Sequence, residues 1–203
     1  DVPFRKIPKK IIPVEEKQLR KKSLTYHADV PTEAVYKVYH VPGRLAKGYV
    51  ECDLLTDILC FGRSSVLEQK LVKNTAVFAN CNGYVLGNVD PGLMVFTGKM
   101  EKGKTAEEGE EALDKVIEEF KAAAVSRQIL EKVRNQAEAM RSYDSVELLN
   151  RAMNLAYYAY LGDPLYYQEE YEKKLTITPK EISASANKIL VEENSSVVYY
   201  KKM

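Results

Sequence analysis

The sequence predicts an α+β domain, in which a mostly antiparallel sheet of five or six strands is covered on one face by helices. Strand-like runs come in two close pairs, which favours antiparallel pairing, and one more run closes the chain. Helical segments dominate after Gly103 and are numerous enough to cover one face of the sheet. A chain of 203 residues with 45% apolar content can bury one sizeable core. We therefore expect a single domain over residues 20–203, preceded by an extended linker from a preceding domain over residues 1–19.

The first half of the chain alternates between extended and helical patterns. Prolines recur every five residues through the lead-in, and proline fixes φ and removes a backbone donor. The runs "RKKSLTYHAD" and "EAVYKVYHVP" are typical of strands, and the second has large side chains on both faces, which places it near the centre of a sheet. Apolar residues at helical spacing from Val50 to Leu59 then predict an amphipathic helix that ends near Phe61.

The second half begins with a predicted hairpin. "AVFANCNGYVLG" and "GLMVFTGKM" are joined by "NVDPG", whose Asp-Pro-Gly favours a turn. Two later helix starts fit the capping box, Thr105 with Glu108 and Thr178 with Glu181. Asp163, followed by proline, predicts a further helix start. The final run "SSVVYY" predicts a closing strand.

A long helical pattern lies between these starts. "SRQILEKVRNQAEAM" carries one apolar face, and "VELLNRAMNLAYYAYL" continues it after a predicted break between Ser142 and Ser145. Arg127, Arg134 and Arg141 recur every seven residues and could line a basic groove. A glutamate follows each of the first two after four residues, so a solvated, ion-paired helix face is the favoured interpretation.

Composition excludes several classes of function. Thirty basic residues against 29 acidic ones give a formal charge of +1, so nucleic acid is not expected as a partner. No apolar run approaches the ~20 residues that a membrane helix requires, so no membrane partner is expected. The sequence predicts a soluble protein and leaves open whether its compartment is the cytoplasm or the periplasm.

Cysteine and histidine do not form a recognisable metal motif. Cys52, Cys60 and Cys81 lack a C-x-x-C pair and are expected to be buried, unreactive thiols. His27 and His40 lie on separate strand-like runs, and their spacing does not favour zinc, so structural roles are predicted. We expect no cofactor and no metal in this chain.

The stretch "GRSS" ahead of an apolar helix raises the possibility of phosphate binding. A phosphate-binding P-loop needs a second glycine followed by lysine, and both are missing here. Ser65 and Glu68 stand three residues apart, which favours a capping box at a helix start, while an anion at the helix N-terminus remains the minor alternative. Six tyrosines in "AYYAYLGDPLYYQEEY" could grip a peptide, although packing of two helix ends is the favoured role. The residues alone predict no catalytic centre.

Several stretches taken in order resemble the pitrilysin and insulinase-type zinc metallopeptidases, which include the mitochondrial processing peptidase. The resemblance rests on "YKVYHVP", "LLTDILCFGRSSVLEQKLVKN", "ANCNGYVLGNVDPGLMVFTGKMEKGKT", "LEKVRNQAEAMRSYDSVELLNRAMNLAYYAYLGDP" and "YEKKLTITPKEISASANKIL". It covers roughly residues 20–200 and is closest to the second, non-zinc domain of one half of such an enzyme. The family's H-x-x-E-H zinc motif is absent from the sequence. The resemblance therefore implies that zinc belongs to a preceding domain and that this chain alone is inactive.

The resemblance also implies a role. In catalysis-supporting domains an arginine and a later tyrosine reach the bound peptide, and here Val72 and Phe78 stand at those positions. Neither supplies the charge or the hydroxyl, so the domain is expected to form chamber wall and interdomain contacts during peptide proteolysis. Its expected partners are the zinc-bearing domain, a second half or subunit, and the peptide substrate. Phe78, Ala79 and Asn80 are the candidate substrate-lining residues, by analogy with strand addition. The alternative is an inactive assembly or binding subunit, like the core proteins of the respiratory complex.

Overall fold

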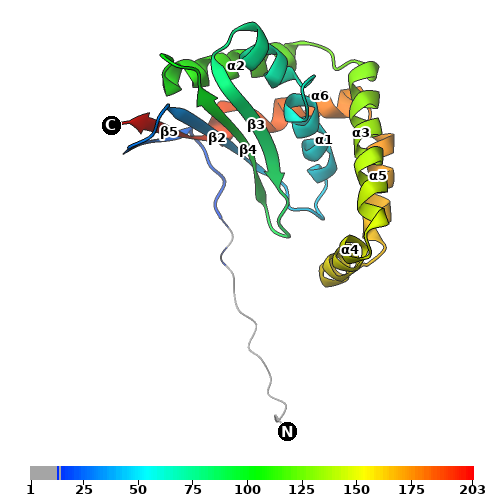
Figure 1. Ribbon diagram of the computed structural model, residues 1–203. Helices are drawn as coiled ribbons and strands as arrows, with labels where there is room; N and C mark the ends of the chain where they lie inside the picture. Colours follow the sequence, from blue (N-terminus) through cyan, green and yellow to red (C-terminus); the bar gives the residue numbers. More distant parts are fainter. Residues whose placement is uncertain (1–12, 14) are drawn as a thin grey trace, which may run out of the picture.

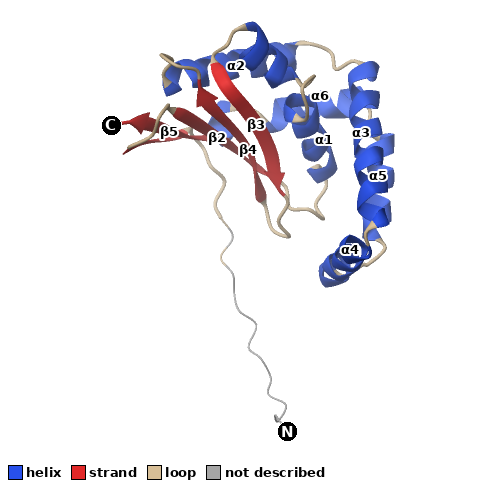
Figure 2. Ribbon diagram, in the orientation of Figure 1, coloured by secondary structure: helices blue, strands red, loops and turns tan. Residues whose placement is uncertain are grey.

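The computed structural model describes residues 13 and 15–203, and it has one layer of strands and one of helices (Figures 1 and 2). This confirms the predicted α+β class with a mostly antiparallel sheet. The sheet has the order β1-β5-β2-β4-β3. Its strands are β1 (Lys22–Ala28), β2 (Ala34–Val41), β3 (Phe78–Leu86), β4 (Gly92–Met100) and β5 (Ser195–Lys202).

The sheet combines one parallel pair with three antiparallel pairs. β1 pairs with β5 in parallel, whereas β2 pairs antiparallel with both β5 and β4. β2 is therefore central, as predicted from its two large-residue faces. β5 lies between β1 and β2, so these two strands, which are neighbours in sequence, are not neighbours in the sheet.

The predicted hairpin of β3 and β4 is confirmed, with Leu86 opposite Leu93 beside the turn. A bulge between Phe78 and Asn80 interrupts the register at the other end of the hairpin. β3 is an edge strand, so one side of its backbone has no strand partner within the described chain.

The helical layer lies on one side of the sheet in Figure 2. The burial pattern of β2 agrees with helices on one face only. Val35 and Tyr39 point to the covered face and are buried, whereas Tyr36 points to the other face and is exposed. α1, α2 and α6 contact the sheet on its buried face. The helices are α1 (Tyr49–Cys60), α2 (Ala106–Ala122), α3 (Arg127–Val146), α4 (Leu148–Leu161), α5 (Tyr166–Thr176) and α6 (Pro179–Ile189).

Helix boundaries confirm some predictions and correct others. Both capping boxes, at Thr105 and at Thr178, are formed. The predicted break between Ser142 and Ser145 is wrong, because α3 continues to Val146 and the break falls at Glu147. The helix predicted to open at Asp163 begins at Tyr166 instead, because the Asp163 carboxylate accepts a hydrogen bond from the Leu165 amide in the preceding turn.

The predicted capping box of Ser65 and Glu68 is also wrong. Ser65 is buried, and its Oγ atom has no hydrogen-bond partner in the part of the chain that the structure describes. The helix turns of this segment continue as a π-helix, η1 (Glu68–Asn74), in place of the regular α-helix that a capping box would begin.

α3, α4 and α5 form an arm beside the sheet and the helices that cover it, with α4 lying farthest from the sheet in Figure 1. The predicted solvated arginine face of α3 is wrong for two of its three members. Arg134 donates hydrogen bonds to the carbonyl oxygens of Lys174 and Ile177 at the end of α5. Arg141 lies 4.1 Å from the ring centroid of Tyr171. These arginines therefore join α3 to α5.

The predicted linker over residues 1–19 falls largely on residues 1–12 and 14, which lie outside the described part of the chain. Near its end, Gln18 is buried, and its Nε2 atom donates to the Ser195 carbonyl over 2.6 Å. The Ser196 hydroxyl donates in turn to Gln18 Oε1 over 3.2 Å. These bonds hold the chain against the start of β5 just before it enters β1.

Candidate functional site

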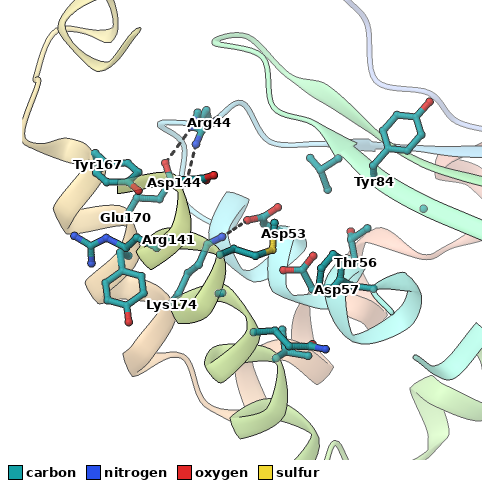
Figure 3. A pocket seen from close by; sticks show the side chains of 18 of the residues that line it. Arg44, Asp53, Thr56, Asp57, Tyr84, Arg141, Asp144, Tyr167, Glu170 and Lys174 are labelled. Carbon is teal, nitrogen blue, oxygen red and sulfur yellow. Dashed lines mark hydrogen bonds and ion pairs between the residues drawn. The ribbon is translucent and has the colours of Figure 1, made fainter. Parts of the chain in front are cut away.

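A cavity of about 410 Å³ lies between α1, the end of β3 and the helical arm (Figure 3). α1 contributes three polar residues to its wall, and β3 contributes Gly83 to Val85. Gly83 allows this close approach of strand and helix, because a Cβ atom there would clash with the Cys60 sulfur at the end of α1. The arm completes the cavity through polar and aromatic side chains of α3, α4 and α5.

Arg44, in the loop between β2 and α1, is held on one side of the cavity by a bidentate ion pair. Its Nε and Nη2 atoms donate to the two carboxylate oxygens of Glu170 over 3.0 and 2.9 Å. Nη2 also donates to the Tyr158 hydroxyl over 2.7 Å. Burial opposes the charge on Arg44, but Glu170 outweighs it and the net pKa of the guanidinium is raised. Arg44 is therefore a fixed cation whose Nε and Nη2 donors are engaged.

Lys174 of α5 is the second paired cation of the cavity. Its Nζ atom lies 2.5 Å from Oδ2 of Asp53 on α1, and Figure 3 shows this pair reaching across the cavity. Burial lowers the pKa of Lys174, but Asp53 outweighs burial and raises it overall. The pair links α1 to α5.

Asp57 stands one helical turn beyond Asp53 but, unlike Asp53, has no ion-pair partner among the described residues. Its carboxylate makes no hydrogen bond or ion pair with any residue that the structure describes. Burial, reinforced by the charge of Asp53, raises the pKa of Asp57 to about 7, although Lys174 acts in the opposite direction. Asp57 is therefore a partly ionised carboxyl facing a cavity near neutral pH.

Gln136 of α3 adds a second unpaired acceptor to the wall. Its Oε1 atom is buried and has no hydrogen-bond partner within the described residues. An unpaired buried acceptor is costly, so it marks a position where a donor would be stabilised. Neither Asp57 nor Gln136 was identified from the sequence. The signal for Asp57 is "ECDLLTDILC", where two aspartates share one face of an otherwise apolar helix.

The structure places the three predicted substrate-lining residues at the opposite end of β3 from the cavity. Phe78 is buried, and its ring packs closely over Gly98 and Gly109, where any Cβ atom would clash with it. Ala79 and Asn80 are exposed at the bulge. The backbone of this segment lies at the sheet edge, so strand addition here stays a prediction, one in which Phe78 would act through its backbone alone.

The other predicted positions lie in the core or on the sheet. Val72 packs against the core. Cys52 and Cys60 are buried, as predicted, and Cys81 is half-buried. Burial raises the pKa of the Cys81 thiol to about 12, which keeps it protonated. His27 lies on β1 and His40 on β2, with β5 between them, and in residues 13 and 15–203 no three potential ligands group closely enough to hold a metal ion. The residues present therefore do not fit a zinc site.

The face of the sheet opposite the helices carries a row of exposed large apolar side chains. On β2 the exposed Tyr36 alternates with buried residues, and on β3 the exposed residues alternate with half-buried ones, whereas β1 is exposed along nearly its whole length. Its exposed members are Leu24, Tyr26, Tyr36, Tyr84 and Leu86. These residues lie on β1, β2 and β3, which β5 and β4 separate in the sheet. Exposed apolar groups on one sheet face are a candidate contact surface.

A buried ionic network lies between the sheet and α2, and the sequence analysis did not identify it. Lys37 of β2 is 3% exposed, and its Nζ atom donates to Glu110 over 2.8 Å and to Asp114 over 2.5 Å. Lys21 and the Tyr199 hydroxyl also contact Glu110. Burial acts to raise the pKa of Glu110, but its three hydrogen bonds outweigh burial and lower the pKa to about 2.

Comparison with known proteins gives one family and a group of related folds. A family model described as the peptidase M16 inactive domain matches residues 1–137. No curated protein matches the chain. In the part of the chain that the structure describes, no helix is both long enough and apolar enough to cross a lipid bilayer.

Three solved structures represent the related folds. A protease from Helicobacter pylori is 22% identical with a TM-score of 0.88, over 96% of this chain and 48% of its own. The inactive peptidase domain of a proposed zinc protease from Bordetella parapertussis is 21% identical with a TM-score of 0.77, over 84% and 92%. A peptidase M16 inactive domain from Pseudomonas fluorescens is 12% identical with a TM-score of 0.73, over 91% and 44%. The chain thus spans about half the length of the Helicobacter protein, and these likenesses establish the fold.

Proposed function

Because the chain belongs to the peptidase M16 family, as one of its inactive domains, we propose that it forms a non-catalytic wall of the substrate chamber of a zinc-dependent peptidase. Zinc and the catalytic residues would come from a zinc-bearing domain of the same assembly. This division of labour is supported by the chain itself, whose sequence lacks an H-x-x-E-H motif.

The observation that carries the proposal is the exposed apolar face of the sheet. Tyr36 lies on the central strand and is 42% exposed, and Tyr26 on β1 is 53% exposed. Tyrosine combines a large apolar ring with a hydroxyl that can pair with a peptide backbone. A face of this kind fits a chamber wall that contacts unfolded chains of varied sequence, and it also fits contact with a neighbouring domain.

The free edge of β3 supports the same proposal. An extended peptide can add to an exposed sheet edge through backbone hydrogen bonds, which do not depend on its sequence. The bulge between Phe78 and Asn80 bends the edge at one end. Peptide pairing would therefore run from Asn80 toward Leu86, with Ala79 at its margin.

The test compares the complete protein, which would carry the zinc-bearing domain, with this chain alone. We expect the complete protein to bind zinc and to cleave a quenched unstructured peptide in a chelator-sensitive manner, and we expect this chain to do neither. In the complete protein, Tyr36→Glu should lower kcat/KM several-fold because it places a charge on the chamber face.

Tyr143→Glu is the matched control, because Tyr143 is 78% exposed on α3, away from the sheet. Equal activity of the two variants would count against a chamber role for the sheet face. A complete protein that is metal-free and inert would favour the alternative of an assembly subunit with the same fold.

A further inference from the structure

The cavity between α1, β3 and the arm has unpaired acceptors, whereas each of its cationic groups has at least one partner. Arg44 is bound by Glu170, and Lys174 is bound by Asp53. Arg141 donates to Gln168 and stacks over Tyr171. Four carboxyl groups (Asp53, Asp57, Asp144 and Glu170) and three cations (Arg44, Arg141 and Lys174) line the cavity, so its net charge is −1 when Asp57 is ionised.

Two carboxylates and one amide oxygen of the cavity wall lack a partner among the described residues. Asp57 and Asp144 make no ion pair there, and Oε1 of Gln136 is buried without a hydrogen bond. Asp144 is exposed, while Asp57 is half-buried and follows the buried Thr56 on α1. A ligand that fits must bring hydrogen-bond donors and a positive charge.

We propose that this cavity binds the basic side chain of a peptide, an arginine or a lysine, with its charged group against Asp57 and Gln136. The wall suits the rest of such a side chain, because Met140 and Phe61 supply apolar surface for its methylene stem. A guanidinium or ammonium group supplies several N–H donors, which a carboxylate and an amide oxygen both accept.

The position of β3 indicates that the cation belongs to a peptide. Gly83, Tyr84 and Val85 line the cavity and also belong to the edge strand. A peptide added to that edge would direct alternate side chains toward the helical layer, where the cavity opens. The inference thus rests on the proposed function, and it adds a preference for a basic residue at one position.

Binding should strengthen as Asp57 ionises. Its pKa is about 7, and two charged neighbours act on it, Asp53 on its own helix and Lys174 on α5. The other charged residues that line the cavity are Arg44, Arg141, Asp144 and Glu170. The affinity for the cation should therefore rise several-fold between about pH 6 and about pH 8.

The experiment titrates this 203-residue chain with short unstructured peptides while amide NMR signals are followed. One peptide carries a single arginine, a second carries lysine there, and a third carries citrulline, which has the shape of arginine without its charge. Free agmatine tests a cation that is not part of a peptide. We expect the arginine or lysine peptide to bind at least tenfold more tightly than the citrulline peptide, and more tightly than agmatine.

Asp57→Asn should abolish this preference, whereas Asp29→Asn, an exposed aspartate on the loop after β1, should retain it. Thermal stability no lower than that of the unaltered chain in both variants would show that lost binding is not lost folding. Equal binding of all three peptides to the β3 edge would overturn the cavity assignment and leave the chamber-wall proposal intact. Agmatine binding as tightly as the arginine peptide would overturn the assignment to a peptide. Binding of none of the probes would also overturn the inference, while the zinc and cleavage assay would still decide the proposed function.

Discussion

The unpaired carboxyl of Asp57 lowers the stability of the fold when it is ionised, and the same carboxyl can bind a cation. Its carboxyl faces a cavity without a partner, and burial together with Asp53 raises its pKa to about 7. A group whose folded pKa lies above its unfolded pKa destabilises the fold when it is ionised. The destabilisation is absent at low pH, grows above the unfolded value of 3.8, and is complete above about 7.

Replacing Asp57 with asparagine should therefore stabilise the chain in a pH-dependent manner. A tenfold change in an ionisation constant corresponds to about 1.4 kcal/mol, and solvent in the cavity reduces the full effect. We expect Asp57→Asn to raise the free energy of unfolding in urea by about 2 kcal/mol near pH 8 and to leave it nearly unchanged near pH 4. Asp29→Asn should show no such pH dependence. A loss of stability at the higher pH would mean that Asp57 has a stabilising partner.

The residue scale also shows what a sequence can reveal of the candidate site. Burial of Cys52 and Cys60 follows from the general habit of cysteine. The unpaired carboxyl of Asp57 cannot be inferred in this way. It depends on Lys174, which lies over a hundred residues away in the sequence and forms its ion pair with Asp53. Phe78 was matched to a substrate-contacting position by sequence order, and only its packing against Gly98 and Gly109 shows that its side chain belongs to the core.

At the scale of the elements, local signals were the ones that sequence could identify. A capping box lies within four residues, so Thr105 and Thr178 marked their helix starts correctly. The boundary at Glu147 has no such signal, because the serines upstream of it tolerate a helix. Arg134 was assigned to a solvated face because the position of α5 beside α3 cannot be derived from the spacing of charges.

The role of Arg134 can be tested through the helix that it caps. Its guanidinium donates to the carbonyl oxygens of Lys174 and Ile177, which end α5. Charged hydrogen bonds each contribute about 1.5–3 kcal/mol, so Arg134→Met should cost about 2 kcal/mol and speed amide hydrogen exchange in the last turn of α5. Arg127→Met removes an exposed arginine of the same helix and should leave exchange unchanged. Similar exchange in the two variants would contradict a capping role.

At the scale of the whole molecule, the network around Lys37 joins the sheet to the helical layer. It connects β2 to α2 through Glu110 and Asp114, and it also contacts Tyr199 on β5. The pKa of Glu110 is lowered to about 2. The stabilisation from its ionised form is therefore fully present above its usual value of 4.5 and is lost as the pH falls through about 2.

Removing the central cation of this network should destabilise the entire domain. Lys37→Met leaves two carboxylates without their shared partner, and breaking a buried pair in this way costs about 3 kcal/mol. We expect a single urea unfolding transition at lower midpoint. Lys99→Met removes an exposed lysine of β4 and should shift the midpoint little. If both variants unfolded alike, the network would not contribute to the stability of the sandwich.

For the whole molecule, sequence patterns are sufficient to predict the fold class. The order of strands and helices along the chain, the hairpin of β3 and β4, and the central place of β2 all follow from local patterns. The order of strands across the sheet does not, because β1 pairs with a strand at the far end of the chain. Long-range pairing leaves no periodic mark in the sequence. The candidate cavity, which gathers residues from five elements, is unpredictable for the same reason.

The place of β5 determines when the sheet can be completed. Among the five strands of the described sheet, β5 is the last to be synthesised, yet it lies between β1 and β2 and pairs with both. Until residues 195–202 have left the ribosome, β1 has no strand to pair with, and the segment before it has no Ser195 carbonyl to bind. Closing so long a loop carries an entropic cost that slows folding. A nascent chain would therefore form the β2–β4–β3 sheet and its helices first, as a partly folded intermediate. Truncation within β5 would leave β1 unpaired as well.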